Sequence, residues 1–140
     1  MAHALVIIGG SIFLLLGALH GILTLSDLTN PRTFTPRDPE LRKAMQRSSI
    51  AIHPTTNLWK AWMGFNFSHS LGLVLFGGAF VYVGVHDPGT FSTSPLLQVC
   101  AVGVSAIYLV LSLLFWFSKP AIGSGLALGC FILAAILAYA

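Results

Sequence analysis

The sequence predicts an all-α protein, an integral membrane bundle of four transmembrane helices. Two observations predict it: the composition and four long apolar runs. Hydrophobic residues make up 56% of the 140 residues and charged residues 8%, and the mean hydropathy is +0.86. A soluble domain carries about a quarter charged residues, so this chain has too little charge to cover a globule with water-compatible surface. The length predicts a single four-helix transmembrane domain, residues 1–140.

Each apolar run is long enough to cross a bilayer. A helix needs about 20 residues to span a hydrocarbon core of ~30 Å, and backbone groups in lipid must hydrogen-bond within the segment. The predicted spans cover residues 4–25, 61–85, 96–117 and 122–139. The first run could instead be a secretory signal. No Lys or Arg precedes it and no small-residue cleavage site follows it, which favours a retained helix.

The long connection over residues 26–56 is polar and has two interpretations. Asp38 followed by Pro39 is typical of a helix N-terminus. Leu41, Met45 and Ile52 then recur at helical spacing among basic residues. The segment is therefore either a short amphipathic helix on an anionic leaflet or a solvated polar loop. The shorter connections, residues 86–95 and 118–120, are expected to be turns.

The basic residues predict the orientation of the spans. Six of the seven Lys and Arg lie between Arg32 and Lys60, and the seventh is Lys119. Four crossings place all seven on one side, which the positive-inside rule makes cytoplasmic. We therefore expect loop 26–56 in the cytoplasm and both termini outside, in an inner (plasma) membrane. Basic residues between apolar runs indicate partners among lipid headgroups and no nucleic acid.

Small residues at four-residue spacing predict where helices approach closely. These stripes are Gly17 and Gly21 in the first run, Gly64, Ser68 and Gly72 in the second, and Gly125 and Gly129 in the fourth.

Polar residues inside the spans form a candidate ligand site. Asn66, His69 and Ser70 are three and four residues apart, so they share a helix face. The third run has a polar stripe, Gln98, Ala101, Ser105, Tyr108 and Ser112. At 1.5 Å per residue, His20 and these groups fall in overlapping layers of the inner leaflet. The expected ligand-binding residues are His20, Asn66, His69, Ser70, Tyr108 and Ser112, with Lys60 at the cytoplasmic mouth.

Three interpretations of this polar layer stay open. The groups could hydrogen-bond across helices and hold the bundle together. They could form a pocket for a lipid, a quinone or another amphiphile. They could also hold a haem, with His20 and His69 as its two axial ligands. Two histidines are few ligands for a metal ion alone, and no carboxylate lies within a predicted span.

The same residues leave enzymatic activity open. Ser68, His69 and Ser70 include nucleophile and base types, but adjacent residues of a helix point apart, so this is no catalytic triad. A lipid-modifying enzyme that uses His69 as a base is the third functional alternative.

The second run also carries a recognisable motif, TTNLWKAWMGFNFSHSLG at residues 55–72. It resembles the second helix of a family of small bacterial four-helix integral membrane proteins. The rest of the chain is similar in outline, including the end of the first run at residues 17–20. The resemblance implies the fold, the topology and a bacterial origin, and it implies no activity and no functional residues.

The leading hypothesis is a binding protein or an accessory subunit. It would hold an amphiphilic ligand or a partner's helix in the inner-leaflet polar layer, as a homo-oligomer or within a larger membrane complex. A small haem oxidoreductase or electron-transfer subunit using His20 and His69 is the alternative, and the lipid-modifying enzyme is the second.

Overall fold

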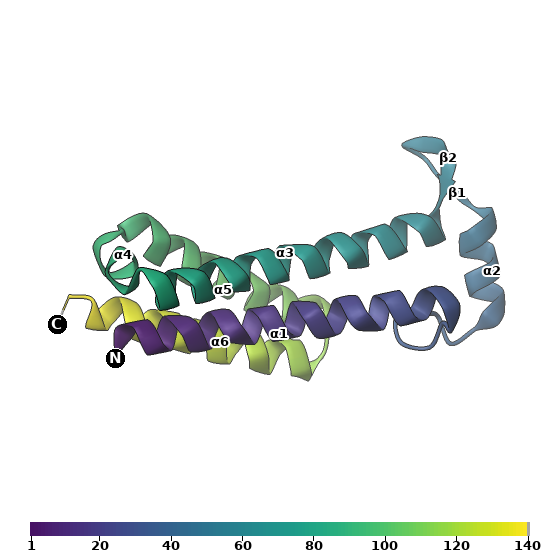
Figure 1. Cartoon of the computed structure of the whole chain (residues 1–140). Helices are drawn as coiled ribbons and strands as arrows, with labels where there is room; N and C mark the ends of the chain where they lie inside the picture. The colour runs from purple at the N-terminus through teal and green to yellow at the C-terminus, as the bar shows by residue number, and fades with distance from the viewer. Residues whose placement is uncertain (140) are drawn as a thin grey trace. The chain divides into compact units, whose positions relative to one another are not determined.

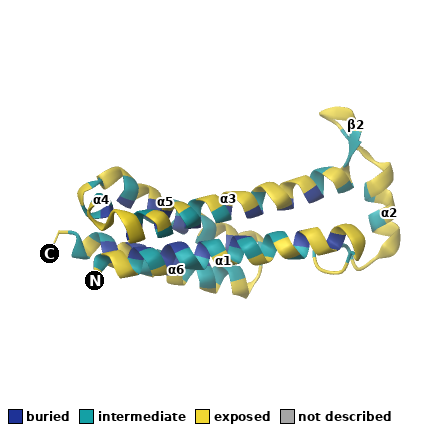
Figure 2. Ribbon diagram, in the orientation of Figure 1, coloured by how far each residue is buried: buried dark blue, intermediate teal, exposed yellow. Residues whose placement is uncertain are grey.

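The computed structural model describes residues 1–139, and within them four helices are long and apolar enough to cross a membrane. These are α1 (Ala2–Thr29), α3 (Leu58–His86), α5 (Pro95–Phe115) and α6 (Ser118–Leu137), as Figure 1 shows. Exposed residues recur along all four helices (Figure 2). Most of the exposed large side chains are aliphatic or aromatic, as lipid contact requires. The all-α, four-helix membrane fold is confirmed.

The helix ends differ from the predicted spans. α1 extends into the polar connection as far as Thr29, and α3 starts at Leu58, before its predicted span. The turn between α5 and α6 is formed by Trp116 and Phe117, so the prediction of a turn at residues 118–120 is wrong. These residues begin α6 instead. Proline is tolerated at Pro120 because backbone N–H groups of a first helical turn have no intrahelical acceptor. The expected turn at residues 86–95 contains one short helix, α4 (Pro88–Thr93).

Of the two interpretations of the polar connection, the one with a short helix is correct. This helix, α2 (Pro39–Arg47), starts as predicted: the side chain of Asp38 accepts a hydrogen bond from the Glu40 N–H at 2.9 Å, and Pro39 is the first helical residue. In Figure 1, α2 runs crosswise to the adjoining ends of α1 and α3.

A small antiparallel hairpin follows α2, and the sequence did not predict it. Its strands are β1 (Ser49–Ile50) and β2 (His53–Asn57). Ile52 lies in its turn with 86% of its surface exposed, so the assignment of Ile52 to the amphipathic helix is wrong. The helix has already ended at Arg47.

The chain folds into two compact units. The core unit comprises Met1–Leu16 and the chain from Leu73 onward, and the histidine unit comprises Gly17–Gly72. α1 and α3 each contribute to both. The single domain predicted for residues 1–140 stays a prediction.

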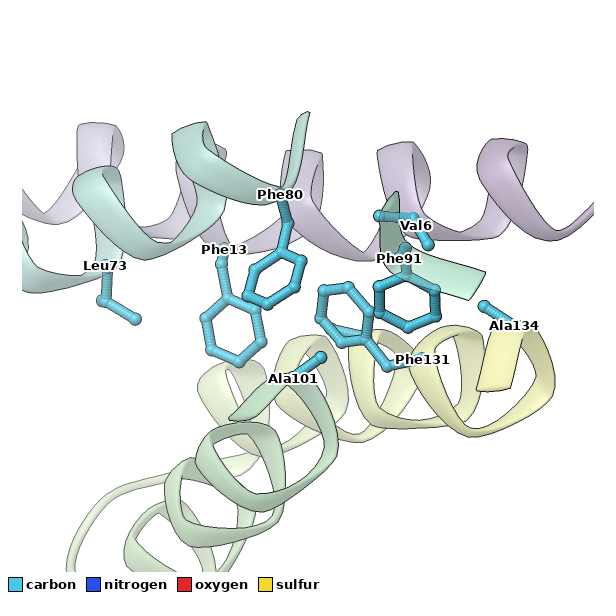
Figure 3. Packing of buried hydrophobic residues seen from close by; sticks show 9 residues of the cluster. Val6, Phe13, Leu73, Phe80, Phe91, Ala101, Phe131 and Ala134 are labelled. Carbon is cyan, nitrogen blue, oxygen red and sulfur yellow. The ribbon is translucent and has the colours of Figure 1, made fainter. Parts of the chain in front are cut away.

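The core unit is centred on phenylalanine side chains (Figure 3). The Phe13 ring lies 5.0 Å from that of Phe76 at an interplanar angle of 86°, and the Phe80 ring lies 5.0 Å from that of Phe131. Such edge-on and tilted pairs add a favourable electrostatic term to the burial of the rings. The whole buried cluster is Val6, Phe13, Leu73, Phe80, Phe91, Ala101, Ala127, Phe131 and Ala134.

The closest helix approach in this unit uses glycines outside the predicted stripes. A Cβ atom on Gly10 would lie 2.8 Å from the Gly77 carbonyl oxygen, so α1 and α3 touch backbone to backbone there. By contrast, a Cβ atom on Gly64 or Gly129 would meet open space, so neither glycine is at a close contact within residues 1–139. Four-residue spacing alone does not show which face of a helix meets a neighbour.

Candidate functional site

A hydrogen bond between α1 and α3 forms the centre of the histidine unit. It joins His20 Nε2 to Asn66 Oδ1 at 2.9 Å, and Asn66 is fully buried. An amide left unpaired in a membrane interior costs several kcal/mol, so each residue supplies the partner that the other needs. The predicted convergence of His20 and Asn66 is present in this unit.

The second hydrogen bond of Asn66 fixes the direction of the first. Asn66 Nδ2 donates to the Trp62 carbonyl at 2.8 Å, one turn earlier on α3. A backbone carbonyl only accepts, so the amide nitrogen faces Trp62 and the amide oxygen faces His20. His20 Nε2 must then be the donor. This network assigns the proton of a neutral His20 to Nε2.

Aromatic rings surround the two histidines. The His20 ring stacks on Phe34 with centroids 4.2 Å apart, and it also contacts His69, at 5.2 Å and 67°. The His69 ring in turn stacks on Phe65 at 5.9 Å. His20 therefore lies in a row of contacting rings that begins in the polar connection and ends on α3.

Phe34 is held in this row by Asp27, the single acidic residue of α1. The Asp27 side chain is 1% exposed, and its carboxylate accepts backbone N–H groups of Arg32, Thr33 and Phe34 at 2.9, 2.9 and 2.6 Å. His20, Thr24 and Asp27 are spaced by four and three residues, so they occupy one face of α1. Thr24 Oγ1 donates to the His20 carbonyl at 2.8 Å on that face.

α3 holds the same segment from its other side. Trp62 Nε1 donates to the Phe34 carbonyl at 2.7 Å. The backbone of Phe34 is thus bonded at its N–H by Asp27 and at its carbonyl by Trp62. From the sequence, residue 27 was expected in the polar connection over residues 26–56, whereas it lies in α1. Neither Phe34 nor Trp62 was expected to belong to the site. The helical spacing of Asp27 from His20 was the available signal.

An open groove of about 500 Å³ adjoins this cluster within the histidine unit. Ligand pockets usually measure about 300–1,000 Å³ and are mainly apolar with a few polar groups, as this groove is. Its lining residues are Thr33, Phe34, Thr35, Pro36, Leu41, Met45 and Trp62. Phe34 belongs to both features, because its ring stacks on His20 and also lines the groove.

Five of the seven predicted ligand-binding residues belong to the histidine unit. Four of them cluster around the His20–Asn66 bond: His20, Asn66, His69 and Ser70. Ser70 is buried, and its Oγ donates to the Asn66 carbonyl at 2.8 Å, a bond within its own helix. Lys60 is exposed in the first turn of α3. The Asn57 side chain accepts its backbone N–H at 2.9 Å.

Tyr108 and Ser112 belong to the core unit. The Tyr108 ring packs edge-on against Phe13 with centroids 5.5 Å apart, and Ser112 is buried on α5. Their convergence with the histidines stays a prediction. The polar stripe of α5 does face inward, and Ser105 Oγ donates to the Ala101 carbonyl at 2.6 Å. Such a bond to the preceding turn satisfies a hydroxyl without a ligand.

The geometry of His20 and His69 does not favour a haem. Imidazole nitrogens bind a metal at about 2 Å, so two axial ligands place their ring centroids roughly 6 Å apart on opposite sides of the iron. The two rings instead contact each other edge-on at 5.2 Å, and His20 Nε2 bonds Asn66. Within residues 1–139, no group of three His, Cys, Asp or Glu residues could hold a metal ion.

The fold and the site define a multi-pass membrane protein with a histidine–asparagine pair beside an open, mainly apolar groove. Comparison of the chain with protein-family models, with curated proteins and with solved structures found no match.

Proposed function

We propose that this protein is a membrane binding protein or accessory subunit that holds an amphiphilic molecule in the groove beside the His20–Asn66 pair. The observation that carries the proposal is the position of Phe34. One ring both stacks on His20 and lines the groove, so the groove adjoins a polar network that includes the fully buried Asn66. An apolar body next to a few polar groups is the chemistry of an amphiphile.

The residues around the groove support binding more than catalysis. Asn66 and Ser70 use their donors on the Trp62 and Asn66 carbonyls of α3, and His20 Nε2 bonds Asn66. A general base needs to reach the proton it removes from a substrate, and these groups are engaged within the protein. The groove itself is lined by Leu41, Met45 and aromatic rings.

The charge distribution supports an orientation for the proposed site. We propose that loop 26–56 faces the cytoplasm and both termini face outside, in a bacterial inner membrane. All seven Lys and Arg would then lie on the cytoplasmic side. Ser49→Cys, in a chain with Cys100 and Cys130 replaced by serine, should react with a membrane-impermeant thiol reagent only in inverted vesicles. Labelling of intact cells at this position would contradict the orientation.

Replacing Phe34 with alanine should reduce the amphiphile that co-purifies with the protein about tenfold. The change removes one wall of the groove and the ring stacked on His20, and a loss of ~1.4 kcal/mol in binding is a tenfold loss in affinity. Lipids and quinones retained per mole of protein would be measured by mass spectrometry in one detergent.

Phe117→Ala is the matched control, because it removes a phenylalanine ring that is 56% exposed in the turn before α6. It should leave the retained amount unchanged. Equal retention in the two variants would contradict the proposal, as would an unmodified protein that retains no amphiphile. Circular dichroism would show that both variants keep their helices.

A further inference from the structure

One guanidinium nitrogen on α2 has no hydrogen-bond acceptor among residues 1–139. Arg42 Nε is buried, and no hydrogen-bond partner for it is present within residues 1–139. Arginine is always charged, and a buried donor of a charged group is costly to leave unpaired. The geometry therefore points to an anionic acceptor that this part of the chain does not supply.

Arg42 is not one of the lining residues, but it lies on α2 beside two that are. Leu41 and Met45, four residues apart on α2, both line the groove, and Arg42 is next to the first and three residues before the second. On a helix this spacing places Arg42 at the flank of the groove-lining face. Lys43 points elsewhere, since it pairs with Glu40 at 2.8 Å and both side chains are exposed.

The surrounding segment is strongly positive. Residues 32–60 contain six Lys and Arg against two acidic residues, Asp38 and Glu40, which gives a net charge of 6 − 2 = +4. Guanidinium groups bind phosphate through paired, charge-assisted hydrogen bonds. A zwitterionic headgroup would bring its own cation into the same positive field, whereas an anionic headgroup would not.

We propose that the groove holds one acyl chain of an anionic phospholipid and that Arg42 binds its phosphate. This assignment rests on the proposed function, since it names the class of amphiphile. A groove of about 500 Å³ has room for one chain or ring system of drug-like size. The exposed cations of the segment, such as Arg37 and Lys60, add attraction for the negative headgroup without fixing its position.

Trp62 provides a reporter because its ring lines the groove. In a chain with Trp59→Phe and Trp116→Phe, Trp62 is the remaining tryptophan, and brominated acyl chains quench its fluorescence on contact. The protein would be placed in mixed vesicles of phosphatidylglycerol and phosphatidylcholine, with bromine on one lipid at a time. Quenching should show about a tenfold preference of Trp62 for phosphatidylglycerol. A chain that keeps Trp116 alone should show no such preference, because Trp116 does not line the groove.

Arg42→Gln and Lys43→Gln form a matched pair that removes one positive charge at adjacent residues. Arg42→Gln should reduce the preference at Trp62 to near one, whereas Lys43→Gln should keep it. Arg42→Lys retains the charge but loses the paired geometry, so an intermediate preference is expected. An equal loss in the two glutamine variants would assign the effect to general surface charge and overturn the role of Arg42.

The remaining outcomes separate this inference from the proposed function. Equal quenching of Trp62 by the two lipids, well above that of Trp116, would overturn the choice of an anionic lipid and leave an amphiphile in the groove. Quenching of Trp62 no stronger than that of Trp116 with either lipid would overturn both. Loss of the preference when inorganic phosphate is added would overturn the lipid assignment in favour of a free-anion site.

Discussion

Replacing Asn66 with leucine should lower the free energy of unfolding by about 2 kcal/mol. Leucine has a similar volume but neither donor nor acceptor. The substitution leaves the His20 Nε2–H without the acceptor that the fully buried Asn66 supplies. The Trp62 carbonyl loses its side-chain donor but keeps the backbone N–H of residue 66 within α3. Each unsatisfied buried group costs about 1–3 kcal/mol. The shift would be measured from the denaturation midpoint in mixed micelles with increasing sodium dodecyl sulfate.

The loss of stability in Asn66→Leu should come more from leaving a buried group unpaired than from losing the energy of the His20–Asn66 hydrogen bond itself. Interhelical hydrogen bonds in membranes contribute only ~0.6 kcal/mol on average, and about 1.7 kcal/mol at most in the cycles measured. In a double-mutant cycle with His20→Phe, we therefore expect a coupling energy of about 1 kcal/mol. His20→Phe alone removes the donor and keeps an aromatic ring against Phe34 and His69.

Ser68→Ala is the control for this experiment. Ser68 lies two residues from Asn66, is exposed, and donates only to the Phe65 carbonyl of its own helix at 2.9 Å. Its substitution should change the free energy of unfolding by less than about 0.5 kcal/mol. Similar midpoints for Asn66→Leu and Ser68→Ala would show that the His20–Asn66 bond does not hold α1 and α3 together.

Helical periodicity accounts for the part of this site that the sequence predicted. Asn66 and His69 share a face of α3 because they are three residues apart, and the depth of His20 on α1 matches theirs. Length and hydropathy predicted the four spans, because a chain segment that crosses lipid has few alternatives to a long apolar helix. Residue spacing does not show how a helix is rotated about its own axis. The depth of Tyr108 and Ser112 in the membrane could therefore be predicted, but not the residues that they contact.

Phe34 was not predictable because its position depends on bonds between segments. It lies in a polar stretch with no periodic pattern, and three contacts place it: Asp27, Trp62 and the His20 ring. A carboxylate that bonds the backbone several residues later leaves no mark in hydropathy. The hairpin after α2 was not predictable either, because its strands are short and its register is irregular.

Replacing Asp27 with asparagine should open the segment that carries Phe34 and increase tryptic cleavage after Arg32 at least about tenfold. Both carboxylate oxygens accept backbone N–H groups: Oδ1 from Arg32 and Thr33, and Oδ2 from Phe34. Asparagine has one acceptor oxygen, so its NH₂ group would face an N–H donor in either orientation.

The expected magnitude follows from the number of bonds lost. A hydrogen bond to a charged group contributes about 1.5–3 kcal/mol, so losing one of these exceeds the 1.4 kcal/mol that corresponds to a tenfold change in the open population. Cleavage of a transiently open segment follows that population when opening is fast. Because Arg32 and Thr33 are exposed, their freed N–H groups can bond water. The effect should therefore be local opening and not global unfolding.

Glu40→Gln supplies the matched control, because it also neutralises a carboxylate of the polar connection. Glu40 is exposed and pairs only with Lys43, an arrangement that contributes about 0–1 kcal/mol. Cleavage after Arg47, which lies beyond the segment held by Asp27, is the internal reference in both variants. Asp27→Asn should raise the ratio of Arg32 to Arg47 cleavage and reduce amphiphile retention as Phe34→Ala does, since both changes displace the same ring. A ratio that is unchanged, or that rises equally in Glu40→Gln, would mean that Asp27 does not position the wall of the groove.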